Sequence, residues 1–92
     1  MRKYIIDFTI EAENDVYKLQ KTGEKVVLKK LAAFLVELET HPETGTGHPE
    51  QLKNNMGVWS RRLTKKHRLV YKIKEEVVTV LVLSSYGHYD DK

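Results

Sequence analysis

The chain has 92 residues, a mass of 10.7 kDa and a formal net charge of +3, with 16 Lys and Arg against 13 Asp and Glu. This length predicts one domain, residues 1–92, with a single modest core, and excludes a dinucleotide-binding unit with a second domain. Because there is no cysteine, neither a disulfide framework nor a thiolate metal site is expected. The longest apolar stretch, Val77 to Leu83, is too short to span a bilayer, and the N-terminus lacks the apolar core of a signal peptide. We therefore expect a cytoplasmic protein that does not bind membranes.

The positive charge is concentrated in one part of the chain. Residues 51–74 contain no acidic residue and the following basic ones: Lys53, Arg61, Arg62, Lys65, Lys66, Arg68, Lys72 and Lys74. Such an asymmetry favours binding to a polyanion. The alternative is a solvated strand face followed by a lysine-rich turn.

The first half of the chain predicts one strand and two helices. Alternating apolar residues indicate a strand over residues 4–8, at the edge of a sheet. Thr9 is a suitable N-cap for a helix over about residues 10–20. A second helix is predicted over about residues 24–39, because apolar side chains recur there at helical spacing: Val27, Leu31, Phe34, Leu35 and Leu38. The short connection between the helices predicts an antiparallel hairpin packed on one face of a sheet.

The second half of the chain predicts an irregular loop and three strands. Residues 41–50 include two Pro, two Gly and two Thr, which is typical of a loop. Strand-like runs follow over residues 57–63, 68–74 and 77–86, and the tight spacers between them indicate a meander of antiparallel hairpins. The predicted fold class is therefore α+β, in the order β-α-α-β-β-β, with a two-helix hairpin on one face of a small antiparallel sheet.

Three arginines lie on adjacent predicted strands. Arg61 and Arg62 point to opposite faces of one strand, and Arg68 lies on the next strand. An arginine held beside another strand's arginine forms a pre-organised phosphate clamp, because the planar guanidinium binds anionic oxygens through two hydrogen bonds. The alternative is that each arginine pairs with a surface carboxylate. That reading is weakened because residues 51–74 contain no acid.

Residues near the loop and the C-terminus offer acid–base chemistry. Glu50 is the only carboxylate from residue 44 to residue 74, and it can accept a proton from a hydroxyl group; a surface salt bridge is the alternative. His88 can act as a general acid and a neighbouring Tyr can stack on a base, although a His near a terminus is more often simply solvated. Four potential metal ligands lack the spacing of a metal site, so neither a metal nor another cofactor is predicted: His41, Glu43, His48 and Glu50.

Four short motifs follow one another along the chain: Gly45-x-Gly47-x-Pro49-Glu50-x-Leu52-Lys53, Gly57-x-Trp59-Ser60-Arg61-Arg62, His67-Arg68-Leu69-Val70-Tyr71 and His88-Tyr89. In this order they resemble the Txe/YoeB branch of the RelE superfamily of toxin–antitoxin toxins, and the resemblance covers essentially the whole chain. It implies a compact RelE/YoeB-like fold that resembles microbial ribonucleases. The best-known form of this branch ends at the Tyr after the His, whereas here Asp90-Asp91-Lys92 follow.

The resemblance implies a ribosome-dependent mRNA endoribonuclease that needs no metal and inhibits translation. Glu50 matches the general base of the family and Arg68 the arginine at the scissile phosphate. His88 matches the general acid, with Tyr89 beside it. RNA supplies its own nucleophile, the 2′-OH, so these residue types suffice for the reaction.

The basic stretch is expected to hold phosphates of ribosomal and messenger RNA. The resemblance places Lys53 and Arg62 at RNA phosphate, and the charge pattern adds Arg61, Lys65 and Lys66. The implied partners are the ribosomal A site, mRNA and an antitoxin of the Phd/YefM type, whose complex with the toxin is expected to bind operator DNA. Two alternatives stay open: a non-enzymatic ParE-like toxin that binds DNA gyrase, and a basic RNA-binding module without catalysis.

Overall fold

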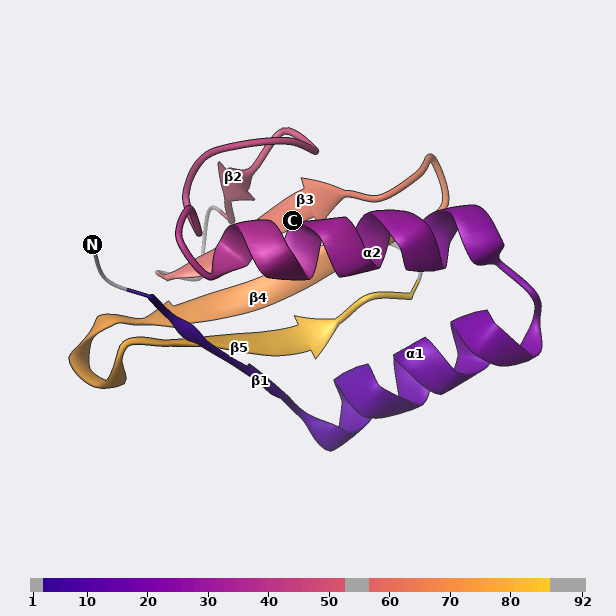
Figure 1. Cartoon of the computed structure of the whole chain (residues 1–92), viewed down its shortest axis with the longest axis horizontal. Coiled ribbons are helices and arrows are strands. Elements are labelled where there is room, and N and C mark those ends of the chain that lie inside the picture. Colours follow the sequence, from indigo (N-terminus) through magenta and orange to yellow (C-terminus); the bar gives the residue numbers. More distant parts are fainter. Residues whose placement is uncertain (1–2, 53–56, 87–92) are drawn as a thin grey trace.

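The computed structural model describes residues 3–52 and 57–86. One five-stranded sheet has the strand order β1-β5-β4-β3-β2, and Figure 1 shows α2 running across one of its faces, with α1 connected to it as a hairpin. The elements are β1 (Ile5–Phe8), α1 (Ile10–Lys21), α2 (Lys25–Leu38), β2 (Glu50–Gln51), β3 (Val58–Arg62), β4 (Arg68–Lys74) and β5 (Thr79–Ser84). The predicted α+β class and the predicted order of helices and strands are confirmed. No helix of the described segments is long and apolar enough to cross a membrane.

Helix α1 begins where the sequence predicts it. The hydroxyl of Thr9 accepts a hydrogen bond from the Ala12 N–H at 3.0 Å, which confirms Thr9 as the N-cap. Glu11 and Glu13 lie in the first turn, and the last turn is basic, so both ends complement the helix dipole. Helix α1 therefore has a fixed start directly after β1.

The main core lies between the helices and one face of the sheet. Strand β4 contributes Leu69 and Tyr71 to this core, with Ile73 packed at its edge, as the alternation of the sequence predicts. The other buried members are Ala12, Leu19, Val27, Leu31, Phe34, Leu38, Leu63, Val80 and Val82. Burial of these side chains is the main source of stability for the fold.

The opposite face of the sheet has a small apolar cluster among the described residues. Leu52, Val58 and Val70 are buried there, with Leu83 packed against them. Strand alternation puts Ser60 and Arg62 on the same face as Val58, and Arg68 on the same face as Val70. On this face the polar side chains therefore lie next to the small apolar cluster.

Three details of the sheet differ from the prediction. Strand β1 pairs with β5 in parallel, so the sheet is mixed rather than antiparallel, because the long intervening chain allows the two strands to run in the same direction. Glu50, the last residue of the predicted loop, forms β2 with Gln51, and this short strand pairs with β3. The last strand begins at Thr79 rather than Val77, since residues 75–77 form a 3-10 turn that Val78 ends in a left-handed conformation.

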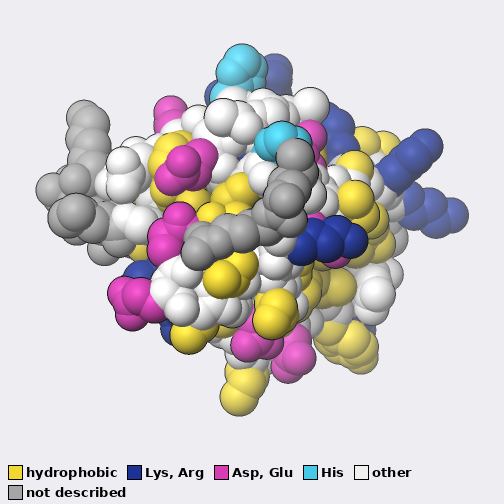
Figure 2. Space-filling model, turned by 60° about the vertical axis from the view of Figure 1, so that its left-hand side comes forward, with side chains coloured by type: hydrophobic (Ala, Val, Ile, Leu, Met, Phe, Trp, Pro, Cys, Tyr) yellow, Lys and Arg dark blue, Asp and Glu magenta, His cyan; other side chains and the backbone are white. Residues whose placement is uncertain are grey.

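The surface is not uniformly basic. Figure 2 shows one face on which hydrophobic side chains remain exposed between acidic and basic ones. The large exposed hydrophobic residues are Ile5, Ile10, Tyr17, Val26, Val36, Val77 and Tyr86. Exposed basic side chains lie on β3, β4 and the turn between them, and also on the two helices, at Lys18, Lys21, Lys25, Lys29 and Lys30.

The N-cap provides a test of the fold. Replacing Thr9 by Ala removes the acceptor for the Ala12 N–H, and we expect the free energy of unfolding to fall by about 1 kcal/mol. Chemical denaturation followed by circular dichroism measures this loss. Thr9→Ser keeps a hydroxyl and should retain most of the stability; equal losses in both variants would contradict the capping role.

Candidate active site

A cavity of about 350 Å³ is lined by His48, Glu50, Arg62 and Arg68. Arg62 and Arg68 are paired directly across β3 and β4, and Glu50 of β2 pairs with Ser60 of β3. The alternation of the strands puts these side chains on the sheet face opposite the helices. The sheet thus brings one carboxylate and two guanidinium groups to the same space.

Arg68 is held in place by side chains from two other strands, β3 and β2. Its Nη1 donates a hydrogen bond to Ser60 Oγ at 2.9 Å and lies 3.8 Å from Glu50 Oε1. The Arg68 side chain is 22% exposed and the Glu50 side chain is 65% exposed. The arginine is therefore oriented before any ligand binds, and the carboxylate is within reach of one.

Two residues of the site, Ser60 and His48, are not among the predicted catalytic or RNA-binding residues, and the sequence suggests His48 only as a potential metal ligand. Ser60 is buried beneath the cavity, and its position between Trp59 and Arg61 was the available signal, since alternation puts it on the face of Arg62. His48 lines the cavity with a backbone φ of 51°, which is uncommon for a residue other than glycine. Within residues 3–52 and 57–86, no group of three or more His, Cys, Asp or Glu is arranged to hold a metal ion.

Apart from Arg61, the predicted site residues divide into three groups. Glu50, Arg62 and Arg68 meet at the cavity. Lys65 and Lys66 are exposed in the turn between β3 and β4, three and four residues after Arg62 in the chain. Three others lie outside the described residues: Lys53, His88 and Tyr89. The tail of residues 90–92 lies outside them as well.

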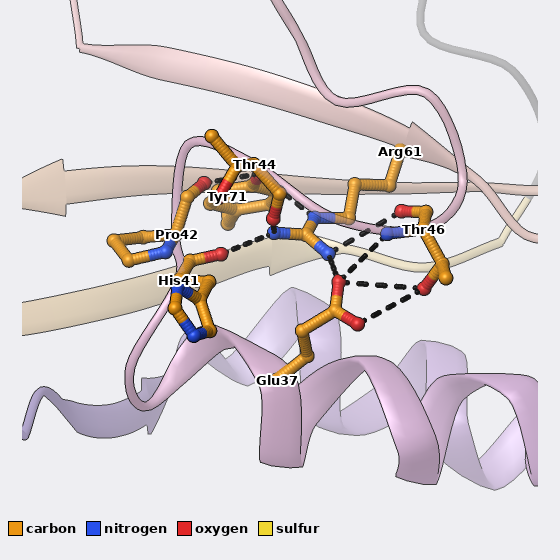
Figure 3. A network of polar contacts seen from close by, with 7 residues as sticks. All are labelled: Glu37, His41, Pro42, Thr44, Thr46, Arg61 and Tyr71. Atoms are coloured by element: carbon orange, nitrogen blue, oxygen red, sulfur yellow. Dashed lines mark hydrogen bonds and ion pairs between the residues drawn. The ribbon is translucent and has the colours of Figure 1, made fainter.

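Arg61 requires a correction. Its side chain is 0% exposed and points to the helix side of the sheet, where it pairs with Glu37 of α2 (Figure 3). The guanidinium also donates hydrogen bonds to the backbone carbonyls of His41 at 2.5 Å and Thr44 at 2.8 Å. A group that is buried and surrounded in this way does not reach RNA phosphate, so the predicted phosphate contact of Arg61 is wrong.

The partners of Arg61 have shifted pKa values. Burial acts to raise the pKa of Glu37, but hydrogen bonds from the Thr46 N–H and Arg61, with the Arg61 charge, outweigh it and lower the pKa below its ordinary value of 4.5. Burial raises the pKa of Tyr71, against the opposing effect of Arg61. The phenol is therefore neutral, and it donates a hydrogen bond to the Pro42 carbonyl at 2.7 Å.

The two glycines of the first motif allow close packing of the loop. A Cβ atom at Gly45 would lie 1.9 Å from Glu37 Oε1. One at Gly47 would lie 2.7 Å from the Phe34 ring and 3.0 Å from the Arg62 carbonyl oxygen, and both glycines have positive φ. The motif therefore serves close contact between the loop, α2 and β3.

Solved structures with the same fold define the class of this protein. The "YoeB/ParE toxin from Agrobacterium tumefaciens" superposes with a TM-score of 0.84 at 30% identity, covering 92% of this chain and 99% of that one. YoeB in the heterotetrameric YoeB–YefM toxin–antitoxin complex from Staphylococcus aureus gives a TM-score of 0.77 at 31% identity, covering 95% and 99%. The class is that of the small toxins of the RelE superfamily.

The sequence specifies the family within this class. Residues 8–89 match the family described as YoeB-like toxin of bacterial type II toxin–antitoxin system. Toxin YoeB of Escherichia coli K12 is 36% identical over 80 residues, which cover 86% of this chain and 92% of that protein. The chain therefore belongs to the YoeB-like toxin family, which confirms the resemblance of its motifs.

The lowered pKa of Glu37 predicts a dependence of stability on pH. Because the pKa is lower in the folded state, ionised Glu37 contributes stability that is complete above the ordinary value of 4.5 and is lost as the pH falls through the folded-state value. The stability difference between the wild type and Glu37→Gln should therefore be constant at neutral pH and shrink below about pH 4.5. Urea midpoints from pH 3 to pH 7 measure it, and a difference independent of pH would contradict the assignment.

The close contacts of Gly47 provide a second test of the loop. Gly47→Ala should lower the free energy of unfolding by more than Gly23→Ala, which also has positive φ but has open space around it. We expect about 1–2 kcal/mol for the backbone strain of Gly23→Ala and roughly 1–3 kcal/mol more for the overlap at Gly47. Urea denaturation compares the two variants, and equal losses would show that the contacts with Phe34 and Arg62 do not matter.

Proposed function

We propose that this member of the YoeB-like toxin family is a ribosome-dependent mRNA endoribonuclease that inhibits translation. The observation that carries the proposal is the meeting of Glu50 and Arg68, from different strands, in one cavity that Arg62 also lines. A carboxylate next to two guanidinium groups suits a reaction in which a proton is removed beside a phosphate. The YoeB relatives support the same assignment by homology.

The proposed reaction needs a base, a phosphate ligand and an acid. Glu50 takes the proton of the 2′-OH, whose oxygen attacks the adjacent phosphorus, and the bond from phosphorus to the 5′ oxygen breaks. Arg68 stabilises the charge that develops on the phosphate oxygens. His88, which lies outside the described residues, would protonate the departing 5′ oxygen, with Tyr89 beside it. The products are a 2′,3′-cyclic phosphate and a 5′-hydroxyl.

The exposed cations around the cavity would bind the RNA backbone. Arg62 faces the cavity, and Lys65 and Lys66 extend the positive surface along the turn that follows it. Lys53 would add a further phosphate contact by its place in the motif. This charge would hold messenger and ribosomal RNA and make binding dependent on salt concentration.

We also propose that an antitoxin of the YefM type neutralises this chain. YoeB and YefM form a heterotetrameric complex in Staphylococcus aureus, and the toxin of that complex has the same fold as this chain. An acidic, partly disordered antitoxin segment would complement the basic surface and become ordered on binding. The complex of this chain with its antitoxin is expected to bind operator DNA.

Replacing the proposed general base tests the enzymatic function. In a reconstituted translation system with a defined messenger, the wild type should cut the messenger within codons, and Glu50→Gln should lower the cleavage rate by about 10²- to 10⁴-fold. Primer extension locates the cuts. The matched control is Glu76→Gln, which removes an exposed carboxylate after β4, away from the cavity, and should cleave as the wild type does.

Three further results would overturn the proposal. Cleavage that persists without ribosomes would show that the protein is a general ribonuclease. An intact messenger together with inhibition of DNA gyrase would favour the ParE-like alternative. Salt-dependent RNA binding without any cleavage product would leave a binding module.

A further inference from the structure

The segment from residue 41 to residue 47 takes its shape from contacts with buried polar groups. It contains no helix or strand, and Pro42 is its only buried side chain. Four of its backbone carbonyls instead accept hydrogen bonds from Arg61 or Tyr71: those of His41, Pro42, Thr44 and Thr46. A loop with so little apolar burial is ordered mainly by these contacts.

Every N–H of the Arg61 guanidinium can be matched with an acceptor. Nε donates to the Tyr71 hydroxyl at 3.1 Å, and Nη1 donates to Glu37 and to the Thr46 carbonyl at 3.3 Å. Nη2 donates to the His41 and Thr44 carbonyls. An arginine has five such donors and five acceptors are present, whereas a lysine has three donors on a single nitrogen. Only arginine can make this full set of contacts from β3.

The far end of the same loop leads into the cavity. Glu37 accepts hydrogen bonds from the Thr46 N–H at 2.9 Å and from its hydroxyl, and the Gly47 carbonyl accepts one from the Arg62 N–H at 2.7 Å. Glu50 follows three residues later, in a strand of two residues whose side chains are both exposed. Such a short edge strand is held on one side by its pairing with β3 and at its start by the loop, so the loop contributes to the position of Glu50.

The backbone of His48 shows that the loop is held firmly. Its φ of 51° is unfavourable for a residue with a Cβ atom, and such a conformation persists only where the surroundings determine it. On one side His48 follows Gly47, which is fixed by Arg62 and packed against Phe34; on the other side it precedes Pro49 and Glu50.

We propose, on the basis of the function proposed above, that Arg61 is a positioning residue for the general base. With Glu37 and Tyr71 it fixes the 41–47 loop, and the loop in turn holds Glu50 opposite Arg68 across the cavity. Of the two adjacent arginines, Arg62 thus contacts RNA phosphate, and Arg61 positions Glu50 through the loop.

Arg61→Lys tests this role, with Arg62→Lys as the matched control. Single-turnover cleavage on programmed ribosomes gives the maximal rate and the half-saturating ribosome concentration. Arg61→Lys should lower the maximal rate by roughly 10- to 100-fold, because the general base is misplaced, and should leave the half-saturating concentration within about 2-fold of the wild type. Arg62→Lys should instead raise the half-saturating concentration by roughly 3- to 10-fold, because a phosphate contact is weakened.

Amide hydrogen exchange measured on the same proteins provides a readout that does not need activity. In Arg61→Lys, exchange should become faster within residues 41–50 and stay unchanged in the helices; in Arg62→Lys it should stay unchanged in the loop, because the backbone N–H of residue 62 remains. Glu37→Gln keeps the shape of its side chain and should reproduce the Arg61→Lys pattern more weakly. It also serves if Arg61→Lys does not fold.

The outcomes separate the two proposals. A wild type that cleaves, beside variants of Arg61 and Glu37 with a faster-exchanging loop and an unchanged maximal rate, would overturn the positioning role alone. Unchanged loop exchange in both variants would overturn it as well. A wild type that does not cleave on ribosomes would overturn the proposed function and the positioning role together.

Discussion

The guanidinium group of Arg61 has no exposed surface, so all its hydrogen-bond acceptors and its counter-ion must come from the protein. The conformation of the 41–47 loop follows from this requirement. Removing such a charge from water costs several kcal/mol unless an opposite charge and hydrogen-bond acceptors surround it. Glu37, whose side chain is 27% exposed, supplies the opposite charge, and backbone carbonyls supply most of the other acceptors. The same hydrogen bonds thereby provide donors for the carbonyls of a loop without secondary structure and acceptors for the buried cation. The same network of hydrogen bonds connects α2, β3 and β4 through Glu37, Arg61 and Tyr71 (Figure 3).

Strand alternation gives two consecutive arginines opposite environments. Arg61 points toward Phe34 of α2, with the centre of its guanidinium 5.9 Å from the ring centroid, while Arg62 points to the cavity. A slip of one residue in the pairing of β3 would exchange these environments, burying the side chain that faces RNA in our proposal. The apolar neighbours on the helix side, among them Leu63, fix the register against such a slip.

Local sequence patterns predict most of the helices and strands, but they do not predict every long-range contact between them. The helical spacing of α2 and the tight turns between β3, β4 and β5 are short-range signals, and the structure confirms the elements they predict. The pairing of Arg62 with Arg68 also follows from the short turn between their strands. The sequence does not predict the environment of Arg61, because its counter-ion, Glu37, lies 24 residues earlier in a helix and a count of nearby acids cannot detect it. The parallel pairing of β1 with β5 is likewise a long-range contact without a local signal.

The exposure of the cavity gives a physical reason why a ribosome would be needed. Water reaches both Glu50, 65% exposed, and Arg68, 22% exposed, in the isolated chain. Proton transfer and the stabilisation of a developing charge are most effective where water is excluded and the groups are already oriented. The chain orients Arg68 through Ser60 and, in our proposal, Glu50 through the 41–47 loop, but both side chains stay accessible to water. A messenger held in the ribosomal A site would bring the surface that closes the cavity, so that orientation comes from the toxin and enclosure from the ribosome. Free RNA, which brings the same phosphate without that enclosure, would then be a poor substrate.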